Sequence, residues 1–103
     1  MVYYSRQVDN DLDDILDGLL MWQKCVLTRE FCLKYISDII DCCDSLDAKT
    51  FHFDAVYETH KRYGKKVYNY SRNKTTSWYI IYNVDIDNNV FINKIISNYL
   101  TVS

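Results

Sequence analysis

The chain has 103 residues, of which 49% are hydrophobic and 25% are charged, and its formal net charge is −2. A chain of this length buries roughly 65% of its unfolded surface, so we expect one domain over residues 1–103 with a single core. No run approaches the roughly 20 apolar residues of a membrane span, and the first residues lack the apolar segment of a signal peptide. The composition therefore favours a domain in the cytoplasm that does not enter a membrane.

The net charge hides an uneven distribution. Residues 1–55 carry 11 carboxylates and 5 Lys or Arg, whereas residues 56–103 carry 3 carboxylates and 7 Lys or Arg. Between His60 and Lys74, six Lys or Arg are interleaved with tyrosines, and no carboxylate occurs. A basic surface attracts phosphate or an acidic protein, while an acidic helical surface repels both. We therefore take residues 60–82 as the candidate functional segment.

The acidic half predicts a strand and a helix. Residues 2–7 begin with Val-Tyr-Tyr, which favours a short first strand. Asp9 or Asn10 is then expected to cap a helix that continues to about Lys24. Its apolar residues recur at helical spacing and should face a core, at Leu12, Ile15, Leu16, Leu19 and Leu20.

A second helix is expected to start after Thr28, whose hydroxyl can accept a hydrogen bond from a free backbone N–H. Glu30 adds favourable charge to its first turn. The predicted buried positions are Phe31, Cys32, Tyr35, Ile36, Ile39, Ile40, Cys43 and Leu46. Because the linker between the helices is short, they should form an antiparallel αα-hairpin.

The basic half changes to the period of two that is typical of strands. Residues 47–54 show no regular pattern, and residues 56–63 predict one or two helical turns that end at Gly64 in a left-handed conformation. Three strands are expected at residues 65–71, 75–84 and 90–98, joined by turns rich in Asn and Asp. The predicted fold class is α+β, with an N-terminal strand, an antiparallel αα-hairpin and a three-stranded antiparallel meander.

Two interpretations of the basic segment remain open. Its cations either are solvated and protect an exposed strand from pairing with another chain, or form a face that binds phosphate or protein. Side chains alternate along a strand, so Tyr68 and Tyr70 should share one face of the sheet and Val67 the other. If Val67 faces the helices, both tyrosines face outward, where they can stack on unpaired bases. For Trp78, Tyr79 and Tyr82 a core role is the better explanation.

The cysteines and histidines do not predict a metal site. The four cysteines lack the Cys-x-x-Cys spacing of zinc ligands, and we expect reduced core thiols at Cys25, Cys32, Cys42 and Cys43. The two histidines have no partner at a metal-ligand spacing, and residues 85–89 lack the remainder of a calcium loop. We expect no metal and no cofactor.

The order of elements resembles the RelE/ParE toxins of bacterial type II toxin–antitoxin systems, the plasmid-stabilisation proteins, over residues 3–99. The segments that carry the resemblance are residues 9–16, 65–72, 78–85 and 90–98. RelE-like members cleave messenger RNA in the ribosomal A site, ParE-like members inhibit DNA gyrase, and an antitoxin wraps around both kinds. The resemblance thus implies a cognate antitoxin as partner, and either the ribosome with its mRNA or gyrase as target.

For an RNase of this family the resemblance implies a metal-independent reaction with Glu58 as the base and Tyr99 as the C-terminal tyrosine. The arginine of such nucleases falls at Tyr79 here and their histidine at Asn98. Arg72, Lys74 or Lys94 would then have to stabilise the charge that develops on the cleaved phosphate. The residues implied in RNA or target binding are Lys61, Arg62, Lys65, Lys66, Tyr70, Lys74 and Lys94, and Arg72 is a third catalytic candidate.

Three functions therefore stay open for this fold. The first is a RelE-like toxin that cleaves mRNA or inhibits translation. The second is a ParE-like gyrase inhibitor or a catalytically inactive binding module. The third is an interaction protein that forms a homodimer through its helical hairpin or its sheet edge.

Overall fold

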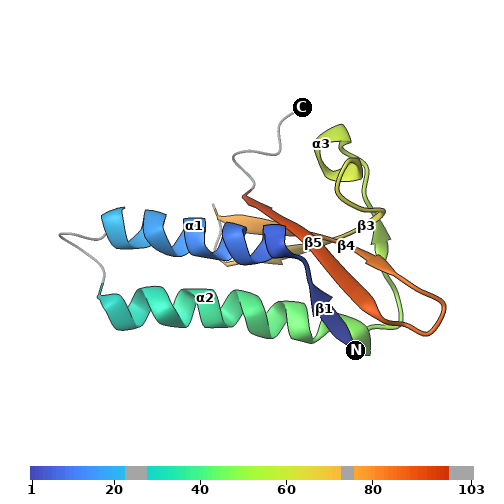
Figure 1. Ribbon diagram of the computed structural model, residues 1–103, viewed down its shortest axis with the longest axis horizontal. Coiled ribbons are helices and arrows are strands. Elements are labelled where there is room, and N and C mark those ends of the chain that lie inside the picture. The colour runs from blue at the N-terminus through green and yellow to red at the C-terminus, as the bar shows by residue number, and fades with distance from the viewer. Residues whose placement is uncertain (23–27, 73–75, 98–103) are drawn as a thin grey trace.

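The computed structural model describes residues 1–22, 28–72 and 76–97. In these ranges a five-stranded sheet lies against two long helices that run side by side (Figure 1). The fold class is therefore α+β, as predicted. None of the helices described is long and apolar enough to cross a membrane.

The sheet has the strand order β1-β5-β4-β3-β2. Its strands are β1 (Val2–Tyr4), β2 (Phe53–Asp54), β3 (Lys66–Ser71), β4 (Ser77–Val84) and β5 (Val90–Ser97). β3 pairs antiparallel with β4 and β4 with β5, while β1 pairs parallel with β5. The sequence predicted four strands, whereas the described sheet has a fifth, β2, which pairs antiparallel with β3 at the far edge. A strand of two residues is too short to produce a periodic signal.

Helix α1 (Arg6–Trp22) begins earlier than predicted. Its cap is Ser5, whose Oγ accepts a hydrogen bond from the backbone N–H of Val8 at 3.3 Å. Asp9 and Asn10, the predicted caps, lie inside the helix. Because strand β1 ends only one residue before this cap, the chain turns from sheet to helix at a single position.

Helix α2 (Arg29–Asp44) begins where the sequence predicted. The Oγ1 of Thr28 accepts a hydrogen bond from the N–H of Phe31 at 3.1 Å. The helix lies beside α1 and runs in the opposite direction (Figure 1). Its buried residues are Cys32, Tyr35, Ile39 and Cys43, all of them predicted, whereas Phe31 is 42% exposed. A short 3-10 helix, Leu46–Ala48, follows.

The core lies between these helices and one face of the sheet. Its buried side chains are Val8, Tyr35, Ile39, Cys43, Leu46, Ile80, Tyr82, Val90, Ile92 and Ile95. Tyr68 and Tyr70 are partly buried and pack against this core, and Val67 alternates with them onto the opposite face. Val67 thus does not face the helices, and the condition under which both tyrosines would face outward is not met.

The buried thiols agree with the sequence-based expectation. Cys32, Cys42 and Cys43 are free, and Cys32 and Cys43 are fully buried. Desolvation raises the pKa of Cys43 well above that of an ordinary thiol, which keeps it protonated. Cys25 lies outside the described residues.

The segment between β2 and β3 crosses the other face of the sheet. It contains the short helix α3 (Glu58–Lys61), in which His60 is fully buried. The ring of His60 lies 4.7 Å from that of Tyr79, which alternates along β4 with core residues. The Nδ2 of Asn93 donates to the carbonyl of Tyr63 at 2.9 Å. α3 therefore lies on the face opposite α1 and α2.

Gly64 ends this segment, but not in the left-handed conformation that the sequence predicted, because no described glycine has a positive φ. Its backbone instead passes directly over strand β4. A Cβ added to Gly64 would lie 2.9 Å from the carbonyl oxygen of Tyr82 and 3.1 Å from the Cγ2 of Ile81. Only glycine allows this close approach.

The predicted turn at residues 85–89 is confirmed. The Asp85 carboxylate accepts hydrogen bonds from the N–H groups of Asp87 and Asn89, both at 2.9 Å. Asn88 has a φ of 63°, a left-handed conformation that asparagine tolerates better than most residues. The polar turn residues thus stabilise the hairpin of β4 and β5.

Substituting the two glycines separates close packing from helix propensity. Gly64→Ala should lower the free energy of unfolding by about 1–3 kcal/mol, because the backbone of Tyr82 cannot move away cheaply. Gly18→Ala, in α1, has no atom within 4 Å of the new Cβ and should stabilise the protein by up to about 1 kcal/mol. Urea unfolding of both variants measures the two effects. If Gly64→Ala and Gly18→Ala changed the free energy of unfolding by the same amount, close packing would not be the reason for glycine at position 64.

Candidate functional site

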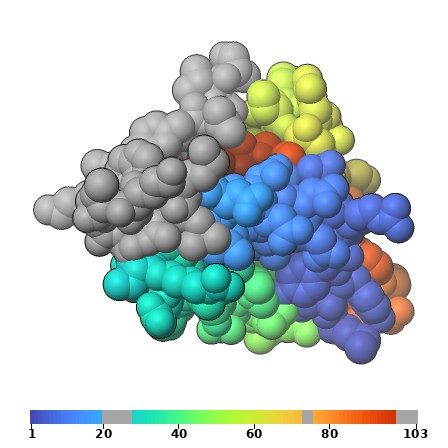
Figure 2. All heavy atoms as spheres, turned by 60° about the vertical axis from the view of Figure 1, so that its left-hand side comes forward, coloured from blue at the N-terminus to red at the C-terminus, as the bar shows by residue number. Residues whose placement is uncertain are grey.

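A pocket of about 600 Å³ opens between α1, α3 and the end of β5. Part of β5 is visible at the surface between these two helices (Figure 2). The residues that line the pocket are Asp11, Asp14, Ile15, Gly18, Leu19, Thr59, Arg62, Tyr63, Trp78, Lys94, Ile95, Ile96 and Ser97. Aliphatic and aromatic side chains thus meet a small number of charged groups, which is the usual character of a binding site.

The pocket exists because β1 is shorter than its neighbour. β1 pairs with β5 only from Val90 to Ile92, although β5 continues to Ser97. Beyond that point α1 lies beside β5 in place of a strand (Figure 1). The last part of β5 is therefore bordered by α1 on one side and by α3 on the other.

Asp11 attaches α1 to this part of β5. Its Oδ2 accepts the backbone N–H of Ile95 at 3.1 Å, and its Oδ1 accepts from Lys94 Nζ at 2.8 Å and from Gln7 at 2.9 Å. Asp11 is only 6% exposed, so these bonds compensate for the loss of hydration of its charge. The carboxylate thus supplies the hydrogen-bond acceptor that a longer β1 would supply to the N–H of Ile95.

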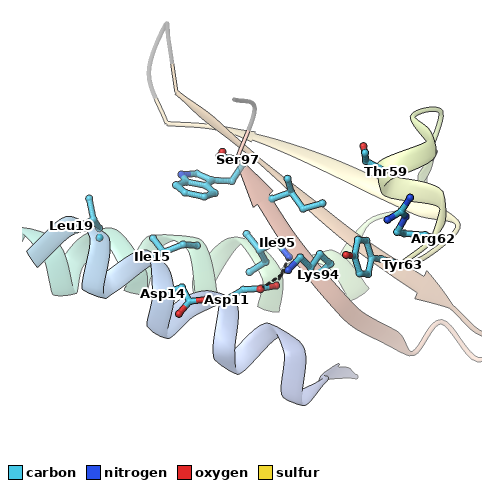
Figure 3. Close-up of a pocket in the computed structure, with 13 residues that line it drawn as sticks. Asp11, Asp14, Ile15, Leu19, Thr59, Arg62, Tyr63, Lys94, Ile95 and Ser97 are labelled. Atoms are coloured by element: carbon cyan, nitrogen blue, oxygen red, sulfur yellow. Dashed lines mark hydrogen bonds and ion pairs between the residues drawn. The ribbon is translucent and has the colours of Figure 1, made fainter. Parts of the chain in front are cut away.

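Lys94 is thereby held in a fixed position. Figure 3 shows its side chain reaching across the wall of the pocket to Asp11. Its Nζ also lies 5.4 Å from the centre of the Tyr63 ring. The charge of Lys94 is balanced by Asp11, so Lys94 supplies a hydrogen-bond donor more readily than a free positive charge.

Arg62 supplies the free positive charge of the pocket. It follows α3 directly, is exposed, and forms no ion pair with any residue in the ranges described. Asp14, which is also exposed, lines the pocket from α1 (Figure 3). With two carboxylates and two cations in its lining, the pocket has formal charges that cancel, and its apolar floor is the larger feature.

Two of the predicted binding residues, Arg62 and Lys94, meet in this pocket, whereas the predicted catalytic residues Glu58 and Arg72 do not. Glu58 is exposed on α3 and lies 3.6 Å from Lys61 Nζ. Arg72 extends toward α2, where its Nη1 lies 2.6 Å from Asp38 Oδ2 and its guanidinium lies 4.2 Å from the centre of the Tyr35 ring. Neither Glu58 nor Arg72 lines the pocket.

The other predicted binding residues are dispersed. Lys66 is paired with Asp54 at 2.5 Å at the β2 edge, and Lys65 is exposed beside it. Tyr70 packs against the core. Lys74 lies outside the described residues, as does Tyr99, the third predicted catalytic residue.

Arg72 has a structural partner that limits its chemistry. Asp38 accepts hydrogen bonds from Lys34 and from Arg72. These bonds, the one from Lys34 with the larger effect, hold the pKa of the Asp38 carboxyl below its ordinary range. The stacked and paired guanidinium of Arg72 connects the end of β3 to α2. This position favours a structural role over a catalytic one.

Sequence reasoning missed Asp11, although a signal was present. Asp11 follows Val8 by three residues and precedes Ile15 by four, so it lies on the apolar side of its helix. A carboxylate at such a position is rarely buried unless it is paired. The pattern therefore indicates a buried ion pair, but it does not identify Lys94 as the partner.

No protein-family model, curated protein or solved structure matches the chain.

His60 makes the attachment of α3 sensitive to pH. Burial lowers the pKa of His60 from its ordinary value of 6.5, because the cation loses hydration between the rings of Tyr57 and Tyr79. The folded state thus binds this proton more weakly than the unfolded state. The contribution of neutral His60 to the free energy of unfolding is fully present above the ordinary pKa. It is lost as the pH falls from that value through the lowered pKa of the folded state.

We expect the free energy of unfolding to decrease as the pH is lowered from about 7 to about 5, in a range above the titration of ordinary carboxylates. His60→Phe keeps an aromatic ring beside Tyr79 and should remove most of this decrease. Urea unfolding at several pH values provides the measurement. A variant with the pH dependence of the wild type would show that His60 does not cause it.

Proposed function

We propose that this chain is the toxin component of a type II toxin–antitoxin system, with a RelE/ParE-like arrangement of its elements. One observation carries the proposal: Arg62 and Lys94, two predicted target-binding residues, come together from α3 and β5 in one pocket. The α+β order of a strand, two antiparallel helices and then the antiparallel strands β3, β4 and β5 also supports the proposal, with β2 and α3 as additional elements before β3.

Two mechanisms are consistent with a toxin of this fold. In a RelE-like mechanism, Arg62 binds a phosphate of ribosome-bound mRNA, and Tyr63, which also lines the pocket, contacts a base. In a ParE-like mechanism, or in an inactive binding module, the pocket receives part of a protein. Tyr99, the C-terminal tyrosine of the family pattern, follows Ser97 of the pocket by two residues in the sequence.

The geometry supports inhibition by binding better than RNA cleavage. Arg72 is engaged by Asp38, and Lys94 is balanced by Asp11, so neither supplies a free charge for a cleaved phosphate. Glu58 is exposed and lies outside the pocket. An apolar floor with nearly balanced charges suits a protein segment more than a nucleic-acid backbone.

A toxin of this kind needs an antitoxin partner in the cytoplasm. Exposed cations at the end of α3 and in the segment that leads to β3, at Lys61, Arg62 and Lys65, favour an acidic segment of that partner.

Induced expression of the chain alone in a bacterial host should arrest growth, and coexpression of the neighbouring gene should restore it. Arg62→Ala should raise the number of surviving colonies at least about tenfold, because loss of an arginine contact at the centre of an interface costs about 2 kcal/mol. Arg29→Ala, which removes an exposed arginine of α2 outside the pocket, is the matched control. Normal growth with soluble protein present would contradict the proposal.

The same strains separate the two mechanisms. If the protein acts by binding, Glu58→Gln should arrest growth as the wild type does, and primer extension should show no new mRNA ends. Incorporation of labelled methionine and gyrase supercoiling assays then identify the target. Loss of arrest in Glu58→Gln, together with loss of mRNA cleavage, would establish the RNase mechanism instead.

A further inference from the structure

Strand β2 forms an open edge of the sheet and carries exposed aromatic side chains. It is the last strand in the order β1-β5-β4-β3-β2. Phe51 and Phe53 are 66% and 63% exposed, and their rings lie 4.9 Å apart. β2 itself has two residues, but unpaired backbone groups at a sheet edge beside exposed apolar side chains are a template for pairing with another strand.

The register shows which backbone groups are open. The N–H of Ala55 bonds to the carbonyl of Lys65 at 2.9 Å, and Phe53 is opposite Val67 two residues earlier. In an antiparallel ladder, alternate residues direct both backbone groups to the same neighbour. The N–H and C=O groups of His52 and Asp54 therefore point away from β3, toward the open edge.

The two faces of this edge differ in chemistry. On the side of the core, Nδ1 of His52 lies 2.7 Å from the hydroxyl of Tyr82, and Asp54 is paired with Lys66. On the opposite side, Phe51 and Phe53 are close to each other and open to solvent. The edge is electrically balanced, because its carboxylate already has a cationic partner.

We propose that β2 pairs antiparallel with β2 of a second copy of this chain, about a two-fold axis that is perpendicular to the sheet and lies midway between the Phe53 residues of the two copies. The two sheets then become one continuous sheet across the dimer. His52 of each copy exchanges both backbone hydrogen bonds with Asp54 of the other. The aromatic side chains of both copies gather on the same face, away from α1 and α2.

This register is the one that the side chains favour. It places Phe53 opposite Phe53 of the second copy, and aromatic pairs at facing positions stabilise antiparallel strands. Phe51 comes opposite Ala55 of the second copy, so that no two carboxylates face each other in this register. A register with Asp54 opposite Asp54 of the second copy would instead bring two carboxylates together, which is unfavourable.

The proposed dimer does not depend on the toxin proposal. β2 is at the opposite edge of the sheet from β1, next to which the pocket of Arg62 and Lys94 opens. Each copy would therefore keep its pocket accessible. Dimerisation and target binding can be tested separately.

Sedimentation equilibrium of the full chain should give twice the monomer mass of 12.3 kDa. Phe53→Glu should raise the dissociation constant about tenfold or more, because two carboxylates then face each other across the axis. Ile86→Glu changes a side chain that is 100% exposed in the turn between β4 and β5, and it should leave the dimer intact. Circular dichroism of both variants verifies that they fold.

Cross-linking tests the register itself. In Phe53→Cys, the two introduced cysteines would occupy a pair without backbone hydrogen bonds, with Cα atoms about 4.5 Å apart, which a disulfide can bridge. Oxidation should therefore give a covalent dimer that reducing agent separates, whereas the wild type and Ile86→Cys should not.

A monomeric wild type would overturn the proposal, and a strand of another protein would then be the expected partner of the β2 edge. A dimer that Phe53→Glu does not weaken would also overturn it. If Leu33→Glu, at an exposed position of α2, weakened that dimer instead, the interface would be the helical hairpin.

Discussion

The contact between Asp11 and the edge of β5 is the constraint on which the rest of the structure depends. β1 provides only three residues of pairing, and α1 then has to cover an edge whose backbone groups still need partners. Asp11 satisfies the N–H of Ile95 and pairs with Lys94 at the same time. One buried carboxylate thus fixes the position of α1, closes part of the sheet edge and forms one wall of the pocket.

The basic segment does not act as one surface. Strand alternation sends Tyr68 and Tyr70 to the core face, and Arg72 is bound to Asp38 of α2. Arg62, by contrast, remains on α3 on the opposite face, beside the pocket. The positive charge that is dense in sequence is therefore divided between two sides of the sheet, and only a small part of it is available to a target. This division is the physical reason for preferring inhibition by binding to catalysis.

Local signals in the sequence predicted much of the fold. The hydroxyl of Thr28 and the Asp85 turn act through neighbours within a few residues, and the structure confirms both. The seam predicted for α2 is confirmed at Cys32, Tyr35, Ile39 and Cys43, whereas Phe31 is exposed. The face that Tyr70 occupies could not be predicted, because alternation defines two faces without stating which one the helices cover. The cap at Ser5 was missed because several acidic residues nearby were equally suitable.

The candidate site was less predictable than the fold, because it depends on contacts between residues far apart in the chain. Arg62 and Lys94 were identified by residue type, but their meeting depends on the length of β1, on a crossing segment that Gly64 allows, and on Asp11. Each of these is a contact between residues far apart in the chain. Glu58 was assigned from a family pattern and Arg72 as a substitute for an arginine of that pattern, and packing directs the two residues to different places.

The central claim is that the pocket between α1, α3 and the end of β5 is the surface that meets the target. Hydrogen–deuterium exchange of the protein, alone and with purified bacterial ribosomes or DNA gyrase, tests it directly. We predict that one of the two targets slows exchange in residues 58–65 and 93–97, while exchange in α2 stays unchanged. Protection confined to α2 or to the β2 edge, or no protection with either target, would contradict the claim.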